Sequence, residues 1–376
     1  MPKGIPHVLS KVLAALLACA TILSLSACSK STGGTSSANT ESGTAGSGEM
    51  IGVSMPTQSL QRWNQDGSNM QKQLESKGYK VELQYANNDV NTQVQQIENM
   101  ITKGCKVLVI AAIDGSSLTD VLSKAKDSGC KVIAYDRLIM KTPNVDYYAT
   151  FDNYKVGAMQ GQYLETKLGL KEGKGPFNIE IFAGDPGDNN SHYFYNGAMD
   201  VLNPYIKSGK LVVQSGQIDF AKVAITGWTS AKAQERMDNL ITSKYTGGTK
   251  LDAVLSPNDS LAIGIIASLQ SNGFGTSDKP YPIITGQDCD IANVKAIIAG
   301  QQSMSIFKDT RLLAEEVVSM VDAILQGSTP ETNNTTDYNN GVKVVPTELL
   351  PPVYVDKSNY EDILIKGGYY TADQLK

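Results

Sequence analysis

The hydrophobic pattern of the chain changes its period repeatedly from residue 50 onward. β-Branched runs at 50–55, 80–86 and 107–113 are typical of strands, and amphipathic stretches at 61–77 and 91–103, each followed by glycine, are typical of helices. The run at 107–113 is apolar on both faces, as a buried parallel strand must be. Strands that alternate with helices of about 10–15 residues predict βαβ crossovers and a parallel, doubly wound sheet.

The alternation starts again near residue 147. Later strands are predicted at 147–152, 177–183, 211–215, 253–256, 283–285 and 303–307, with helices between them that include 154–168, 291–299 and 310–325. We therefore expect an α/β fold of two similar Rossmann-like lobes, each a doubly wound parallel sheet. Lobe 1 would comprise residues 50–152 and 290–327, and lobe 2 would comprise residues 153–289 and 342–376. Residues 327–341 predict a loop, and the proline-containing segment 342–355 suits an extended chain but not a central strand.

Residues 1–27 predict an export signal. Lys3 and Lys11 precede an apolar run at 12–25 that is too short to span a bilayer comfortably. The ending Leu-Ser-Ala-Cys resembles the bacterial lipobox, in which the cysteine, here Cys28, is diacylated and becomes the mature N-terminus. An ordinary signal peptide that happens to contain a cysteine is the alternative. Residues 28–49, rich in Ser, Thr and Gly, predict a flexible tether, so we expect an extracytoplasmic protein held to the cell membrane by a lipid anchor.

Charge and histidine content exclude several classes of function. The chain has 33 Lys and Arg against 38 Asp and Glu, which argues against a nucleic-acid binder because phosphate contacts need clustered cations. Of the 2 histidines, His7 lies in the leader, so a multi-histidine metal site is excluded. His192 alone remains for Ser/His or Cys/His catalysis, and we interpret it as a loop or rim residue. We expect no metal and no cofactor.

Three cysteines of the mature chain lie beside apolar, strand-like runs. They are Cys105, Cys130 and Cys289. We expect three buried, reduced thiols, and a Cys105–Cys130 disulfide is the alternative, although nothing in the spacing requires it.

Polar and aromatic side chains stand directly after the predicted strands. In an open α/β sheet, ligands bind beyond the carboxyl ends of the strands, so a site is expected there. A carboxylate or amide oxygen accepts a hydrogen bond from a sugar hydroxyl, Arg or Lys donates to the hydroxyl oxygen, and a flat aromatic ring suits the apolar face of a pyranose. The combination predicts a site for a neutral polyol. The candidates are Arg62, Trp63, Asp136, Arg137, Asp188, Asn190, Trp228, Asn258, Asp288 and Lys308.

Taken singly, these residues have structural alternatives, namely helix capping or turn formation, a local ion pair, a solvated surface charge, and packing between the lobes. Capping or turn formation is the alternative for Asp188–Asn190 and Asn258, and a local ion pair is the alternative for Asp136–Arg137. A solvated surface charge is the alternative for Arg62 and Lys308, and packing between the lobes is the alternative for Trp228. The conjunction at successive strand ends is what favours a binding site. Which of Asn258 and Asp259 contacts the ligand stays open.

Several motifs occur together in this chain. They are Arg62-Trp63, Gln96-Ile97-Glu98-Asn99-Met100, Tyr135-Asp136-Arg137, Asp188-Asn189-Asn190, Gly286-Gln287-Asp288, Phe307-Lys308 and the proline-rich tail at 343–353. In these motifs, from residue 51 to about 374, the chain resembles the bacterial sugar-binding proteins that serve ABC transporters, near the multiple-monosaccharide-binding receptors and the xylose-binding proteins.

The resemblance implies two lobes joined by three crossovers, with sugar held in the cleft between them. Lobe 1 would contribute Arg62, Asp136, Arg137 and Lys308, lobe 2 would contribute Asp188, Asn190, Trp228 and Asn258, and Asp288 would lie at a crossover. Between residues 217 and 228 the loop is longer than in xylose-specific relatives, which favours the broader group of hexose and pentose binders.

The function implied by the resemblance is capture of a monosaccharide, such as glucose, galactose, xylose or arabinose, and its delivery to an ABC permease. We expect a monomer without enzymatic activity. One alternative is a sugar sensor for a chemoreceptor or histidine kinase. The other is a carbohydrate-active enzyme that uses Asp136, Asp188 or Asp288 as acid and base. Carboxylates interleaved with Arg and Lys stay ionised, which suits binding better than proton transfer.

Overall fold

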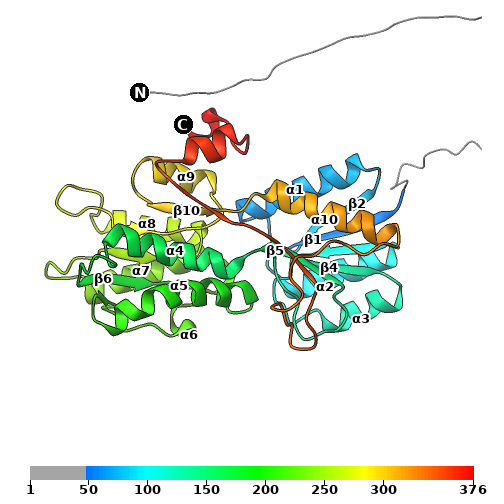
Figure 1. Cartoon of the computed structure of the whole chain (residues 1–376), viewed down its shortest axis with the longest axis horizontal. Helices are drawn as coiled ribbons and strands as arrows, with labels where there is room; N and C mark the ends of the chain where they lie inside the picture. The colour runs from blue at the N-terminus through cyan, green and yellow to red at the C-terminus, as the bar shows by residue number, and fades with distance from the viewer. Residues whose placement is uncertain (1–47) are drawn as a thin grey trace, which may run out of the picture. The chain divides into compact units, whose positions relative to one another are not determined.

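The computed structural model describes residues 48–376, which belong to one unit of the chain, Thr44–Lys376. The predicted signal peptide, the lipidation residue Cys28 and the tether up to residue 47 lie outside the described residues. The described residues form the expected α/β fold, with two lobes that each hold a parallel sheet flanked by helices (Figure 1). No helix among residues 48–376 combines the length and the apolar character needed to cross a bilayer.

Lobe 1 is built on a six-stranded parallel sheet in the order β11-β5-β4-β3-β1-β2. Helices cover both faces of the sheet. The central strand β3 is therefore buried along its whole length, and its residues are apolar on both faces. The strands are β1 (Met50–Met55), β2 (Lys80–Tyr85), β3 (Val107–Ile110), β4 (Lys131–Tyr135), β5 (Tyr147–Phe151) and β11 (Thr347–Leu350), and the helices are α1 (Gln61–Ser76), α2 (Val90–Thr102), α3 (Thr119–Asp127) and α10 (Thr310–Leu325).

Lobe 2 is built on a four-stranded parallel sheet in the order β7-β6-β8-β9. Its strands are β6 (Phe177–Ile181), β7 (Leu211–Val212), β8 (Ala253–Leu255) and β9 (Ile283–Ile284). Its helices are α4 (Asn153–Leu168), α5 (Asn189–Lys207), α6 (Phe220–Val223), α7 (Ser230–Lys244), α8 (Asp259–Ser271) and α9 (Ile291–Ile298), with a short 3₁₀ turn at Thr226–Trp228. A separate antiparallel pair joins β10 (Met304–Phe307) to β12 (Val353–Asp356), and the chain ends in the turns Glu361–Lys366 and Ala372–Leu375.

The chain crosses between the lobes after β5, after β10 and after β11, which agrees with the three expected crossovers. Two parts of the predicted lobe assignment are nevertheless wrong. Residues 347–350, assigned to lobe 2, form β11 and pair in parallel with β5 of lobe 1. The segment from α9 to β10, assigned to lobe 1, packs against α8 and α4 of lobe 2, whereas α10 packs on α1 as predicted (Figure 1).

The predicted extended character of residues 342–355 is confirmed. β11 is the edge strand of its sheet, and Pro346 and Pro351 stand immediately before and after it. Both prolines lie outside the paired residues, so neither removes a hydrogen bond of the sheet, and on its outer side β11 forms an isolated antiparallel bridge from Thr347 to Asn334.

Candidate functional site

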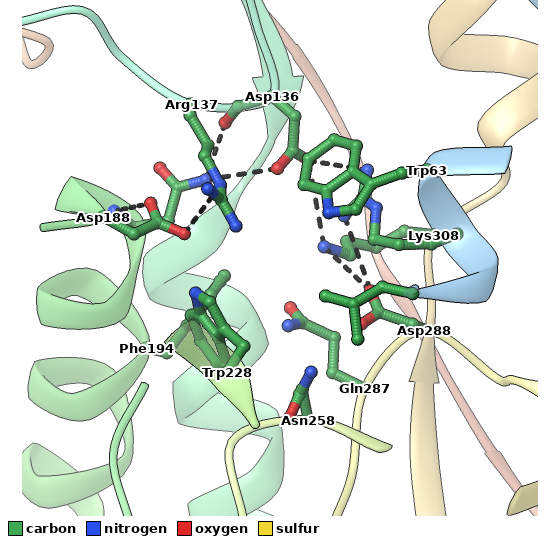
Figure 2. Close-up of a pocket in the computed structure, with 13 residues that line it drawn as sticks. Trp63, Asp136, Arg137, Asp188, Phe194, Trp228, Asn258, Gln287, Asp288 and Lys308 are labelled. Carbon is green, nitrogen blue, oxygen red and sulfur yellow. Dashed lines mark hydrogen bonds and ion pairs between the residues drawn. The ribbon is translucent and has the colours of Figure 1, made fainter. Parts of the chain in front are cut away.

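One cavity gathers the residues that follow the strands of both lobes. It holds about 310 Å³ of space free of protein atoms. Figure 2 shows the side chains that converge on it. All ten residues predicted from the sequence line it, and every lining residue except Leu60 is buried. The lining residues are Leu60, Arg62, Trp63, Asp136, Arg137, Asp188, Asn190, Phe194, Trp228, Asn258, Gln287, Asp288 and Lys308.

Arg62 is the centre of a buried ionic network. Its guanidinium lies 3.0 Å from Asp136 Oδ2 and 3.5 Å from Asp288 Oδ1, and on its other edge it pairs with Asp66 at 2.8 Å. Lys308 Nζ lies 3.2 Å from Asp288 Oδ1 and 3.8 Å from Asp136 Oδ2, so two cations share the same two carboxylates (Figure 2). The solvent-exposed alternatives for Arg62 and Lys308 are therefore wrong, since Arg62 is 6% and Lys308 3% exposed.

The network controls protonation within it. Burial disfavours the charge on Arg62, but Asp136, Asp66 and Asp288 outweigh burial and raise the pKa of the guanidinium. Burial would likewise raise the pKa of Asp136, yet Arg62, Lys308 and the adjacent arginine together hold it below its usual value. Asp136 is therefore an ionised hydrogen-bond acceptor at neutral pH.

Contacts between the two lobes close one side of the cavity. Arg137 Nε lies 2.9 Å from Asp188 Oδ2, and Asn190 Nδ2 donates to the Asp136 carbonyl at 2.6 Å (Figure 2). Tyr148 donates its hydroxyl to Asn190 Oδ1 at 3.1 Å. The pair Asp136–Arg137 is thus not a local ion pair, because each member binds a partner from another part of the chain.

Asp188 combines two of the roles that the sequence analysis set against each other. Its Oδ1 accepts from the Asn190 backbone N–H at 3.0 Å and caps α5, while its Oδ2 pairs with Arg137 in the cavity. Burial raises the pKa of Asp188, and Arg137 opposes that rise. Asn258 behaves in the same way: its Oδ1 caps α8 by accepting from Leu261 N at 3.0 Å, and its side chain lines the cavity.

Asn258, and not Asp259, lines the cavity. Asp259 is fully buried behind it, where its Oδ1 accepts from Gln302 at 2.8 Å and from Ser305 at 2.9 Å, and its Oδ2 accepts from the Asp290 backbone N–H at 2.9 Å. Both carboxyl oxygens of Asp259 are therefore hydrogen-bonded within this scaffold.

The apolar side of the cavity belongs to Trp228 and Phe194. Their rings meet edge to face with centroids 6.3 Å apart. Gly184 makes this placement possible, because a Cβ at that position would overlap the Trp228 ring. Trp63 lies on the opposite side of the cavity (Figure 2). The guanidinium carbon of Arg62 lies over the Trp63 ring, 4.4 Å from its centroid.

Three cavity residues other than glycine have left-handed backbone. The φ angles are 57° at Asp136, 53° at Trp228 and 99° at Asp288. Such conformations are costly for residues with a side chain, and they persist where the surrounding structure requires them, which is most often at functional sites.

Five polar atoms of the cavity lining are buried without a hydrogen-bond partner in the described chain. Two of them, Asp136 Oδ2 and Arg137 Nε, are held in ion pairs. The other three have no partner of either kind: the indole nitrogens of Trp63 and Trp228, which are donors, and Gln287 Oε1, which is an acceptor. Buried polar groups are almost always satisfied, so unpaired ones in a cavity indicate hydrogen bonds reserved for a ligand or water.

Three of the lining residues were not among the candidates predicted from the sequence: Leu60, Phe194 and Gln287. Phe194 lies four positions after Asn190 on α5, so helical spacing would have pointed to it. His192 is absent from the lining and stacks on Phe220 with centroids 4.1 Å apart. Among the described residues, no group of His, Cys, Asp and Glu has the geometry of a metal site.

The three cysteines among residues 48–376 are buried and unpaired. Cys105, Cys130 and Cys289 are free thiols, so the alternative of a Cys105–Cys130 disulfide is not realised. Cys130 instead donates its thiol hydrogen to the Cys105 carbonyl oxygen.

Comparisons with known proteins place the chain in a family. Residues 51–329 match the periplasmic binding protein domain. Over 326 residues, 87% of this chain and 92% of the relative, it is 59% identical to the multiple sugar-binding periplasmic receptor ChvE of Rhizobium radiobacter. Over 325 residues, 86% of this chain and 92% of the relative, it is 38% identical to the D-xylose-binding periplasmic protein of Escherichia coli K12.

A solved structure agrees with these relatives. An ABC transporter solute-binding protein from Clostridium phytofermentans, crystallised with bound β-D-glucose, is 60% identical to this chain. It superposes with a TM-score of 0.85, and the match covers 87% of this chain and all of that one. The resemblance stated from the sequence is confirmed: the chain belongs to the periplasmic binding protein family.

Proposed function

We propose that this protein is an extracytoplasmic lipoprotein that captures a monosaccharide, an aldohexose or aldopentose, and delivers it to an ABC importer. The observation that carries the proposal is the enclosed cavity whose buried donors and acceptor lack partners. The printed ligands of related proteins support it, since they are multiple sugars for the Rhizobium receptor, xylose for the Escherichia protein and glucose for the Clostridium structure.

The charge of the cavity favours a neutral ligand. Three cations, Arg62, Arg137 and Lys308, stand against the three carboxylates of Asp136, Asp188 and Asp288, so the lining carries no net charge. A sugar ring fits this lining because its hydroxyls both donate and accept, while its C–H face packs on an indole.

Closure of the two lobes on the sugar gives the binding mechanism. The ligand would contact Arg62 and Asp136 from lobe 1 and Asn190 and Trp228 from lobe 2, so it stabilises the arrangement in which both lobes surround it. The contacts of Arg137 with Asp188 and of Asn190 with the Asp136 carbonyl belong to that arrangement. An importer that recognises only the closed form would then distinguish loaded from empty protein.

Binding without conversion is the expected chemistry. Each cavity carboxylate is paired with a cation, and the pKa of Asp136 is held low. The pKa of Asp188 is raised, but its Oδ1 caps α5 and its Oδ2 pairs with Arg137, whereas a general acid needs a carboxyl that can release its proton to the substrate. Incubation with free sugars or a chromogenic glycoside should therefore give no product.

Isothermal titration tests the proposal. The mature protein, without residues 1–27, is titrated with glucose, galactose, xylose and arabinose, and with open-chain sorbitol as the control. We expect micromolar or tighter binding of at least one aldose and at least tenfold weaker binding of sorbitol. Absence of heat from all four aldoses would refute monosaccharide capture.

Delivery and anchoring need separate tests. Deletion of the gene should abolish uptake of the bound sugar if the partner is an importer; retained uptake with a lost chemotactic or transcriptional response would favour the sensor. The substitution C28A should move the protein from the membrane fraction to the soluble exported fraction. Membrane retention of that variant would contradict the lipid anchor.

A further inference from the structure

Asp66 stands directly behind Arg62, outside the cavity. The two residues lie one turn apart on α1, so their side chains share a face of the helix. Arg62 donates from Nε and Nη2 to Asp66 Oδ2 at 2.9 and 2.8 Å, and Tyr135 donates its hydroxyl to Asp66 Oδ1 at 2.5 Å. Asp66 is 0% exposed and is not among the lining residues. It therefore contacts the cavity only through Arg62.

This contact decides which way the guanidinium points. Because Asp66 occupies the Nε edge, only Nη1 and the remaining hydrogen of Nη2 face the cavity side, where Asp288 and Asp136 lie at 3.5 and 3.0 Å. The guanidinium is planar and its five donors form a rigid fork, so fixing one edge fixes the others.

We propose that Asp66 is a positioning residue for the sugar site: its ionised carboxylate fixes the orientation in which Arg62 presents its donors to the ligand, and thereby sets the affinity. The inference rests on the proposed function and adds to it a residue that never contacts sugar.

Asp66 also gives the buried network one negative charge more than it has positive charges. Three cations, Arg62, Arg137 and Lys308, face the three lining carboxylates, and Asp66 adds a fourth carboxylate that no further cation balances. Burial raises the pKa of Asp66 to about 6, and Asp136 adds to the rise, while Arg62 and Tyr135 oppose it.

Every element around Asp66 presents a group that responds to its charge. Arg62 comes from α1 itself, Tyr135 from β4, Tyr85 from β2 and Tyr369 from the C-terminal segment, and Asp66 raises the pKa of all three tyrosines. Asp136, next to Tyr135, repels the Asp66 carboxylate. Tyrosines remain neutral over the range of pH 5 to 8, so Asp66 is the member of this set that titrates near pH 6.

The sign of the pH effect follows. Below about pH 6 the protonated carboxyl no longer holds Arg62 by its charge, so affinity falls as the pH is lowered through that value. If only the ionised form binds well, affinity at pH 5 is about tenfold weaker than at pH 7.5. Since sugar selects the ionised form, binding near pH 6 also releases about half a proton.

The test is titration with D-glucose of the wild type, D66N and a matched control, D322N. Asp322 is the right control because it also accepts a tyrosine hydroxyl, from Tyr79 at 2.6 Å, and pairs with a cation, Lys77 at 3.1 Å, but lies remote from the cavity lining. Each protein is titrated between pH 5 and 8, and at pH 6 in two buffers of different ionisation enthalpy, which reports proton release.

We expect D66N to bind glucose at least tenfold more weakly at pH 7.5, and to lose the step in affinity and the proton release that Asp66 causes near pH 6. Asp290, whose pKa burial and Asp288 raise to about 7, is present in all the variants, so the comparison is between D66N and the wild type at each pH. D322N should keep the wild-type affinity and pH profile. The variant Y135F serves if D66N does not fold: loss of the hydroxyl donor raises the pKa of Asp66 further, so the midpoint of the affinity profile should move to higher pH.

The outcomes separate the two proposals. If the wild type binds none of the aldoses, the proposed function fails and this inference fails with it. If the wild type binds glucose but shows no proton release near pH 6, or if D66N keeps the wild-type affinity and profile, the role of Asp66 is refuted while sugar capture stands.

Discussion

The two walls of the cavity hold their side chains in place by different means. In lobe 1, Arg62 is oriented by ion pairs with Asp66 at 2.8 Å and with Asp136 at 3.0 Å. In lobe 2, Asn258 is oriented by the helix it caps, and Trp228 by its own backbone and by the space that Gly184 leaves. The lobe 1 wall depends on charge and these two residues of lobe 2 on backbone and packing; Asp188, which pairs with Arg137 of lobe 1, is the exception in lobe 2.

The difference teaches what each wall is sensitive to. Buried charges are stable only as balanced sets, so removing one member of the lobe 1 network strands the others, and the penalty depends on pH. Packing and capping carry no such linkage. Mutations in the lobe 1 wall should therefore reduce both stability and affinity in a pH-dependent way, whereas mutations of Asn258 and Trp228 in the lobe 2 wall should reduce affinity with little dependence on pH.

The largest effect is expected for R62M. Loss of the Arg62 guanidinium leaves the carboxylates of Asp66, Asp136 and Asp288 with Lys308 as their remaining cation. The free energy of unfolding at pH 7 should therefore fall by about 3–5 kcal/mol, and glucose binding should become undetectable. The stability deficit should shrink between pH 7 and 5, because the stranded carboxylates then protonate. Urea unfolding at both values measures this.

The control for that variant is K103M. Lys103 pairs with Glu82 at 2.7 Å, but its side chain is 50% exposed, so its loss should change the stability by less than about 1 kcal/mol at either pH. Equal deficits for R62M at pH 5 and 7 would show that stranded charge is not the cause.

A smaller effect is expected for W228L. The substitution keeps an apolar side chain but removes the indole face and its unpaired N–H, so affinity for glucose should fall by about tenfold to a hundredfold. The ratio to the wild-type affinity should be the same at pH 5.5 and 7.5, since no ionisable group is changed. Isothermal titration at both values measures it.

The matched control is F274L. Phe274 is an aromatic residue of the hydrophobic cluster of lobe 2 that also contains Trp228, but it does not line the cavity. It should lower the melting temperature and leave the affinity unchanged. A pH-dependent ratio for W228L would mean that the aromatic wall is coupled to the ionic one and would end the distinction between them.

Much of this site follows from the sequence for a simple physical reason. Asp136 follows β4 and Asn258 follows β8, so each stands at the carboxyl edge of the parallel sheet of its own lobe, and both edges face the cavity. Lys308 follows β10, which a parallel bridge from Ile306 to Gln287 places beside the chain that follows β9. Phe194 and Asp66 were not selected, since each lies a helical turn beyond a candidate and not at a strand end.

The lobe assignment of the C-terminal segment could not be read from a local pattern. β11 has four residues and pairs with β5, about 200 positions earlier in the chain, and nothing in its own composition names that partner. Pairing between distant strands is decided by which sheet offers an open edge, which is a property of the assembled lobes.

The smallest expected effect distinguishes Asn258 from Asp259. N258S keeps an oxygen for the cap on Leu261 N but removes the amide donor, so affinity should fall about three- to tenfold with little change in stability. Gln302, Ser305 and the Asp290 backbone all donate to the Asp259 carboxylate, and D259N places an N–H group among these donors. The melting temperature of D259N should therefore fall, while the folded protein keeps its affinity within about threefold. Titration and thermal unfolding of both variants measure the two effects, and the reverse result, affinity lost in D259N and kept in N258S, would make Asp259 the ligand contact.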